Sequence, residues 1–168
     1  MKSIILKLAV FAIIVLFVGA LILNKLKFKP TGQLNSSSNN TVPIIIGSQL
    51  INVEIADTNE KRMQGLSNKT NLSDKKGMLF IFEDKDISPF FWMKEMNFPI
   101  DIIWINDSKI VQVDKNIPAP GAQTPESELT LYKPAQPIDY VLEVSAGFSE
   151  ENDIKVGDMV NLSSVTLN

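Results

Sequence analysis

The feature that most limits the fold is a series of short apolar runs separated by turn-forming residues, starting at about Val42. The runs VPIIIG, INVEIAD, GMLFIF, IDIIWI, KIVQVD and IDYVLEV are each six or seven residues long, the length of a strand rather than a helix. Within residues 51–56, apolar and polar side chains alternate, which predicts one buried face. Short strands with frequent turns are typical of small sandwiches and barrels. We therefore expect residues 42–168 to form a mostly β (α+β), compact, β-barrel-like domain.

One or two short helices complete this prediction. Asp57 and Glu60 have the spacing of a capping box, and Gly65 is a stop signal, so a helix of two to three turns is expected there. The acidic segment SEEND, residues 149–153, predicts a helical turn. Residues 115–137 contain five prolines and predict a long loop, a class of segment that often carries function.

Further strands are expected at PFFWM, residues 89–93, and as a pair or a bent strand in residues 154–167. A hairpin turn is expected at residues 106–108. The segment 156–160 resembles the Gly-Asp turn box of cradle-loop β-barrels. In that box, the glycine permits a tight turn and the aspartate accepts backbone N–H bonds.

The N-terminal part has a different character. After a short tail, residues 1–3, the segment 4–23 holds 20 residues with a single charge, Lys7. A helix of that length is about 30 Å long, which matches a bilayer core. We interpret it as one transmembrane helix that precedes the domain and serves as an uncleaved anchor. The alternative is a cleaved secretory signal, for which residues 18–20 have suitably small side chains.

Residues 24–41 form a juxtamembrane basic segment and a flexible linker rich in Ser and Asn. Because a short N-terminal tail usually stays inside the cell, the domain is expected outside the cytoplasm, in a single-pass membrane protein, or secreted if the signal is cleaved. A cytoplasm-facing regulator is the alternative that depends on topology alone.

Charge and missing residue types exclude several functions. Residues 1–29 carry five lysines and no acid, whereas the remainder carries 11 basic and 19 acidic residues. An acidic domain argues against nucleic acid as a partner. The chain has no cysteine and no histidine. This excludes disulfides, thiolate metal sites and histidine bases, so we predict no cofactor and no metal site, and any bound cation would be a hard, oxygen-liganded one.

Several motifs together resemble the bacterial and archaeal family called domain of unknown function 192. They are Arg62, Gly65-Leu66, Gly77-Met78-Leu79-Phe80, Phe91-Trp92-Met93-Lys94, Pro99-Ile100-Asp101, Tyr140-Val141-Leu142-Glu143, Ala146-Gly147 and Gly157-Asp158. The resemblance covers about residues 50–165 and implies a small β-rich domain, often with an N-terminal signal or anchor, but no accepted activity. The chain departs from the family at Ser67-Asn68-Lys69, where Met and then Arg are usual, and at Glu95-Met96, where Asn-Thr is favoured.

Five residues are candidates for a binding site: Arg62, Trp92, Lys94, Asp101 and Glu143. Asp101 is expected to be buried, where it caps a turn or pairs with Lys94 or Arg62. Glu143 alternates with apolar neighbours and is expected to be exposed. Alternatively, Asp101 and Glu143 form a carboxylate pair for acid–base chemistry on a sugar or peptide.

The cationic and aromatic residues have two interpretations each. Lys94 is expected to lay its stem on aromatic surface with the amine in water, or else to bind an anionic group together with Arg62. The aromatic residues either fill the core or form a platform for carbohydrate; these are Phe90, Phe91, Trp92, Phe98 and Trp104. Residues 117–125 are either a lid or a surface crossover, and residues 83–86 are interpreted as a solvated turn.

These observations favour a membrane-anchored, extracytoplasmic binding or accessory module rather than an enzyme, with the membrane and an unknown protein or carbohydrate as partners. The alternative is a carboxylate-dependent hydrolase that acts on cell-envelope carbohydrate.

Overall fold

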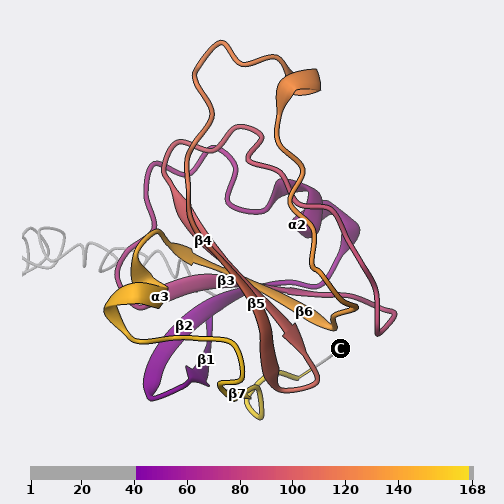
Figure 1. Ribbon diagram of the computed structural model, residues 1–168, viewed down its shortest axis with the longest axis vertical. Helices are drawn as coiled ribbons and strands as arrows, with labels where there is room; N and C mark the ends of the chain where they lie inside the picture. The colour runs from indigo at the N-terminus through magenta and orange to yellow at the C-terminus, as the bar shows by residue number, and fades with distance from the viewer. Residues whose placement is uncertain (1–40, 167–168) are drawn as a thin grey trace, which may run out of the picture. The chain divides into compact units, whose positions relative to one another are not determined.

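The structure is a computed structural model that describes residues 41–166 (Figure 1). The predicted tail, membrane anchor and most of the linker, residues 1–40, lie outside the described residues. Within residues 41–166, no helix is long and apolar enough to cross a membrane.

Seven strands form one sheet, in the order β5-β4-β6-β3-β2-β1-β7. Their bounds are Thr41–Ile46 for β1, Gln49–Ala56 for β2, Lys76–Ile81 for β3, Ile100–Asn106 for β4, Lys109–Ile117 for β5, Tyr140–Ser145 for β6 and Val160–Asn161 for β7. Strands β2 and β3 are parallel, and the other neighbours are antiparallel. The sheet curls into a half-barrel, with two short helices, α2 (Asn59–Gln64) and α3 (Phe148–Glu151), and a 3-10 turn, η1 (Glu126–Glu128). The predicted mostly β fold with short helices is therefore confirmed.

Backbone hydrogen bonds join the two ends of the sheet at one rim. The N–H of Ile110 in β5 donates to the carbonyl of Asp158 at 2.9 Å, and the N–H of Val160 in β7 donates to the carbonyl of Ser108 at 2.8 Å. The turn before β7 is the predicted one: Gly157 has a φ of 98°, and Asp158 Oδ2 accepts from the N–H of Lys155 at 2.9 Å.

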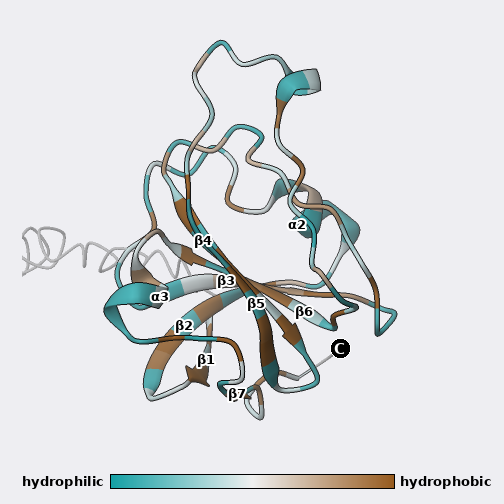
Figure 2. Ribbon diagram, viewed as in Figure 1, coloured by the Kyte–Doolittle hydropathy of each residue, from teal (hydrophilic) through white to brown (hydrophobic). Residues whose placement is uncertain are grey.

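The two faces of the sheet bury separate apolar clusters. The inner face of the curl buries Ile44, Ile46, Ile51, Val53, Leu79, Ile81, Ile103, Ile105, Ile110, Leu142, Val144, Ile154 and Val160. The outer face packs under loops and buries Ala56, Leu66, Met78, Phe80, Met93, Met96, Ile100, Ile102, Trp104, Ile117, Ile138 and Val141. Strands β3, β4 and β6 are apolar on both faces because both faces are covered, and Figure 2 shows hydrophobic colour concentrated on the strands.

Helix α2 begins and ends close to the prediction but is shorter. Thr58, not Asp57, is the N-cap, and its Oγ1 accepts from the N–H of Lys61 at 3.3 Å. Gly65 ends the helix with a φ of 50°, as its position predicted. Only six residues are helical, which is less than the two to three turns expected.

Three predictions about where strands begin and end were wrong. Residues 89–93 contribute only one isolated bridge, between Phe91 and Tyr132, because this segment leaves the sheet and covers its outer face. Of the described residues in 154–166, only β7, two residues long, is a strand. In the opposite sense, β5 continues to Ile117, into the proline-containing stretch that was expected to be loop from residue 115.

Candidate functional site

The aromatic side chains of segment 90–94 lie partly in the core and partly at the surface. Phe91 points inward, where its ring makes edge contacts with Phe80 and Trp104 at centroid distances of 4.8 Å and 5.5 Å. Because side chains alternate in an extended segment, Phe90 and Trp92 point to the other side. Phe90 is 64% exposed, whereas Trp104 is fully buried. Phe98 packs against the outer cluster, so only Phe90 and Trp92 remain available to a ligand.

A second extended segment widens this surface. Phe91 and Tyr132 exchange two backbone hydrogen bonds of 2.8 Å each, which sets Leu131 across from Trp92 in an antiparallel pair. Leu131 is 56% exposed. We call the surface formed by Phe90, Trp92 and Leu131 the aromatic platform.

Lys94 lies at the rim of the aromatic platform. Its Nζ is 5.3 Å from the centroid of the Trp92 ring and 2.7 Å from Oε2 of Glu126. The predicted placement of Lys94 on aromatic surface is therefore confirmed. The hydrogen bond to Glu126 raises the pKa of Lys94. Glu126 belongs to η1, near the far end of the long loop that extends beyond the sheet in Figure 1.

A groove of about 540 Å³ adjoins the aromatic platform and is lined by residues 112–118 of β5 and the following loop, and by residues 131–133. Alternate side chains of a strand point to opposite faces, so a groove on one face would be lined by every second residue. Here consecutive residues of β5 line the groove. The groove therefore follows the free edge of β5, which is the outermost strand on this side of the sheet.

Polar side chains hold the walls of this groove in place. Asp114 accepts from Trp104 Nε1 at 2.8 Å and from Gln112 Nε2 at 3.0 Å. The Gln112 Oε1 accepts from the backbone N–H of Ala135 at 2.7 Å, which ties β5 to the segment that follows the opposite wall. The amide and carboxyl groups of Gln112 and Asp114 are thereby fixed before any ligand arrives.

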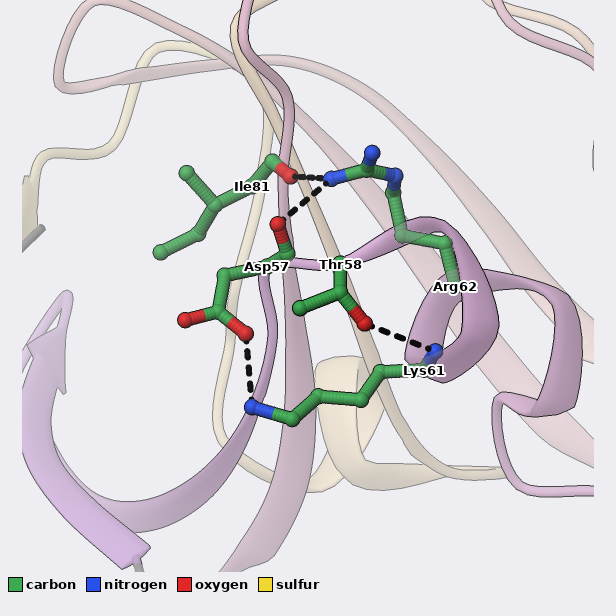
Figure 3. Close-up of polar contacts among 5 residues, drawn as sticks. All are labelled: Asp57, Thr58, Lys61, Arg62 and Ile81. Carbon is green, nitrogen blue, oxygen red and sulfur yellow. Dashed lines mark hydrogen bonds and ion pairs between the residues drawn. The ribbon is translucent and has the colours of Figure 1, made fainter. Parts of the chain in front are cut away.

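The Arg62 guanidinium contacts main-chain carbonyls rather than residues of the aromatic platform (Figure 3). Its Nη1 donates to the carbonyls of Ile81 at 2.6 Å and Asp57 at 3.0 Å. Ile81 is the last residue of β3, and Asp57 directly follows β2, the parallel neighbour of β3. Its Nη2 donates to Asn59 Oδ1 at 2.7 Å. The adjacent pocket of about 240 Å³ is lined by Glu83 and Asp84 among others. These contacts bind Arg62 to carbonyl oxygens and give no support to a joint anion site with Lys94.

Asp101 is a buried turn anchor. It is fully buried, and its carboxylate accepts from the backbone N–H groups of Asn116 at 2.8 Å, Gly147 at 3.2 Å and Ser149 at 2.9 Å. The expectation that Asp101 caps a turn is confirmed, but its partners are these N–H groups rather than Lys94 or Arg62. It joins the end of β5 to the start of α3.

Glu143 was expected to be exposed, and that prediction was wrong. Only 5% of the residue is exposed, and burial in apolar surroundings raises the pKa of its carboxyl group to about 8. Glu143 does alternate with the inner-face residues as predicted, but loops cover the outer face. In register, Asp101 lies opposite Val144 and Glu143 lies opposite Ile102. The two carboxyl groups therefore point to opposite faces of the sheet and cannot act as a pair on one substrate.

Two loops that pack on the outer face through Leu66, Met93 and Met96 hold each other, and we call them the cover. The Asn68 side chain donates to Glu95 Oε2 at 2.8 Å, and the Asn68 N–H donates to the Glu95 carbonyl at 2.9 Å. The Ser67 hydroxyl donates to the carbonyl of Lys94 at 2.8 Å. Asn68 and Glu95 both adopt positive φ, 63° and 56°. The two sequence departures from the family pattern thus contact each other.

The family assignment rests on more than these motifs. A family model, that of domain of unknown function 192, described as an uncharacterized ACR, matches residues 42–162. The chain belongs to this family. The resemblance found in the sequence is therefore confirmed, and the family's description names no activity. No curated protein matches the chain.

Two solved structures are similar to this member of the family. One is a protein of unknown function from Novosphingobium aromaticivorans DSM 12444, with 28% identity, a TM-score of 0.63 and coverage of 72% of this chain and 84% of that one. The other, from Sinorhizobium meliloti 1021, is described as a candidate transcription regulator, with 29% identity, a TM-score of 0.61 and coverage of 72% and 91%.

Of the five predicted site residues, the structure brings together only Trp92 and Lys94. Sequence reasoning missed Leu131 and the groove wall at Gln112 and Asp114. Leu131 lies in the brief apolar stretch LTLY within the long loop, and that stretch was the available signal. The pairing of residue 132 with residue 91 depends on the tertiary fold and is not visible in the sequence.

Proposed function

We propose that this chain is a membrane-tethered binding module outside the cytoplasm and that its ligand is a carbohydrate chain of the cell envelope. The observation that carries this proposal is the aromatic platform beside a groove with prearranged polar walls. The groove has a volume of about 540 Å³ and is largely open to solvent along β5.

The chemistry of the two surfaces suits a sugar ring. The faces of Phe90 and Trp92 offer apolar area to the C–H face of a pyranose, with specific ring geometry. The Gln112 Nε2 group already donates to Asp114 and to the Lys133 carbonyl, so Gln112 Oε1 and the Asp114 carboxylate offer acceptors to ring hydroxyls. The Lys94 Nζ and Glu126 Oε2 atoms, 2.7 Å apart, connect the platform to the long loop. This loop would therefore lie beside a ligand that binds on the platform.

The N-terminal sequence supports the location. Residues 4–23 have the length and composition of a membrane anchor, and residues 30–40 are a polar stretch of 11 residues. A flexible chain of that length spans on average about 20 Å. A domain on such a tether would reach ligands close to the membrane surface, such as polymers of the envelope.

Other functions have less support. The hydrolase alternative needs two carboxyl groups about 5–9 Å apart in a cleft, whereas Asp101 and Glu143 lie on opposite faces and Asp101 already accepts three N–H groups. The description of the Sinorhizobium protein concerns that protein. Here, residues 30–168 carry 11 basic and 19 acidic residues, which disfavours contact with phosphates.

Tryptophan fluorescence offers a direct test, because the chain has two tryptophans and Trp104 is fully buried. The full chain, in detergent micelles, is titrated with oligosaccharides of N-acetylglucosamine. We expect saturable change of the Trp92 emission. Phe90→Ala is expected to weaken binding by about tenfold or more, as hot-spot aromatic residues do.

The matched control is Leu50→Ala, because Leu50 is 58% exposed but lies in β2, away from the platform residues in the sheet order. Leu50→Ala should leave the affinity unchanged. Unchanged affinity in Phe90→Ala, or saturable binding only of extended peptides, would contradict the proposed ligand class.

A further inference from the structure

The carboxyl group of Glu143 is a buried polar group without a matching partner. Among residues 41–166, Glu143 Oε2 has no hydrogen-bond partner, although the residue is only 5% exposed. Groups of this kind are rare in folded proteins, because leaving a buried acceptor unpaired is unfavourable. The proposed carbohydrate groove does not use Glu143, which lies on the outer face of the sheet and not in the groove.

Three buried methionines belong to the outer cluster, on the face of the sheet on which Glu143 lies. Met78 in β3 is its direct register partner. Met93 and Met96 occupy one turn of the cover, in which the N–H of Met96 donates to the carbonyl of Met93 at 3.2 Å. All three methionines are at most 7% exposed and belong to the same outer cluster.

Polar contacts connect this turn, through Lys69, to the row of strand residues that contains Glu143. Asn97 Nδ2 donates to the carbonyl of Lys69 at 2.9 Å, and Lys69 Nζ is 2.7 Å from Glu54 Oε1. Glu54 is the register partner of Met78, which in turn pairs with Glu143. The row Glu54–Met78–Glu143 is therefore tied to the cover at its Glu54 end.

A carboxylate with thioether neighbours selects a soft ion of low charge. Magnesium and calcium prefer six or more oxygen ligands, and no group of three or more His, Cys, Asp or Glu side chains suited to a metal occurs within residues 41–166. Thioether sulfur favours copper(I). We propose that Glu143, Met78, Met93 and Met96 form a binding site for copper(I), closed by the two covering loops.

This proposal revises the expectation from the sequence that any bound cation would be hard and oxygen-liganded. That expectation considered cysteine and histidine and overlooked methionine. Binding requires the Glu143 carboxylate, so its proton passes to the buffer when the ion enters. The bound ion then supplies the positive charge that the buried carboxylate otherwise lacks.

The test uses silver(I), which has the charge and ligand preference of copper(I) and does not change oxidation state in air. The full chain in chloride-free buffer is titrated with silver nitrate by isothermal calorimetry. We expect one tight ion per chain in the parent, and binding weakened by at least about tenfold in Glu143→Gln and in Met96→Leu. Leucine is close to methionine in volume, so Met96→Leu keeps the packing.

The exposed methionines provide the matched controls. Met63 is 71% exposed and Met159 is 62% exposed, so Met63→Leu and Met159→Leu should keep the tight site. Circular dichroism of each variant establishes that the fold persists. The proposal is overturned if a folded Glu143→Gln variant binds silver(I) as tightly as the parent, or if the loss in Met96→Leu is matched by that in Met63→Leu.

Discussion

Replacing Glu143 by glutamine removes an ionisable group from the outer core while keeping its shape. Burial raises the pKa of Glu143 from 4.5 to about 8. Each pKa unit corresponds to about 1.4 kcal/mol of differential free energy. The shift therefore lowers the free energy of unfolding by up to about 5 kcal/mol at pH values above 8, relative to strongly acidic solution.

The sign of the pH dependence follows from proton binding. Below about pH 4.5 the carboxyl group is protonated in both the folded and the unfolded chain, so burial has no ionic cost. Between about pH 4.5 and 8 the unfolded chain loses this proton while the folded chain keeps it. Stability therefore falls as the pH rises through this window. Glutamine has no such proton to lose, so the stability of Glu143→Gln does not fall in this window. The variant should be more stable than the parent at pH 7, by up to about 3 kcal/mol.

The assay is urea unfolding of metal-free protein at a series of pH values from about 5 to 9. The difference in the free energy of unfolding between Glu143→Gln and the parent should grow with pH. Glu150→Gln serves as control, because Glu150 is exposed, and its difference should stay near zero. A difference for Glu143→Gln that is constant across this range would refute the reasoning, since the carboxyl group would then titrate alike in both states.

Three further substitutions test the framework. Asp101→Ala should lower the free energy of unfolding by about 3 kcal/mol, because it leaves three backbone N–H groups, one of them fully buried, without their acceptor, as measured by urea unfolding. Arg62→Lys should cost about 1–2 kcal/mol in the same assay, because lysine lacks the planar fork that spans two carbonyls and Asn59. Gly77→Ala should lower the melting temperature, because its Cβ would lie 2.8 Å from the carbonyl oxygen of Glu143, and such overpacking costs about 1–3 kcal/mol.

Matched controls distinguish these effects from general sensitivity. Asp153→Ala removes an exposed carboxylate and should leave the free energy of unfolding nearly unchanged. Met63→Ala alters the same helix as Arg62 at an exposed position and should be close to neutral. If Asp101→Ala unfolds like Asp153→Ala, the three hydrogen bonds to Asp101 do not stabilise the domain.

The strands were the most predictable part of the fold, because their information is local. The runs at 42–47, 51–57 and 77–82 correspond to β1, β2 and β3, since apolar alternation and flanking turns act within a few residues. Gly65 and Gly157 were predictable for the same reason: each occupies a positive-φ position at a turn. The segment 89–93 was not, because its apolar side chains pack on the sheet from a loop instead of pairing within it.

The candidate site was predictable only in part. The contact of Lys94 with Trp92 followed from the expectation of a lysine stem on aromatic surface, whereas the sequence left Trp92 itself open between core and platform. The burial of Glu143 could not be deduced, because alternation shows which face a side chain takes but not whether loops cover that face. The groove was likewise invisible, since residues 112–118 and 131–133 meet only through the long loop.

We propose above that the groove along β5 and the aromatic platform bind envelope carbohydrate. Hydrogen exchange of backbone amides, measured by mass spectrometry on the full chain in micelles with and without soluble glycan strands from bacterial cell wall, tests it most directly. We expect slower exchange in residues 112–118 and 131–133 when the glycan is present. Unchanged exchange there, or slowing confined to the β1–β2 hairpin, would contradict it.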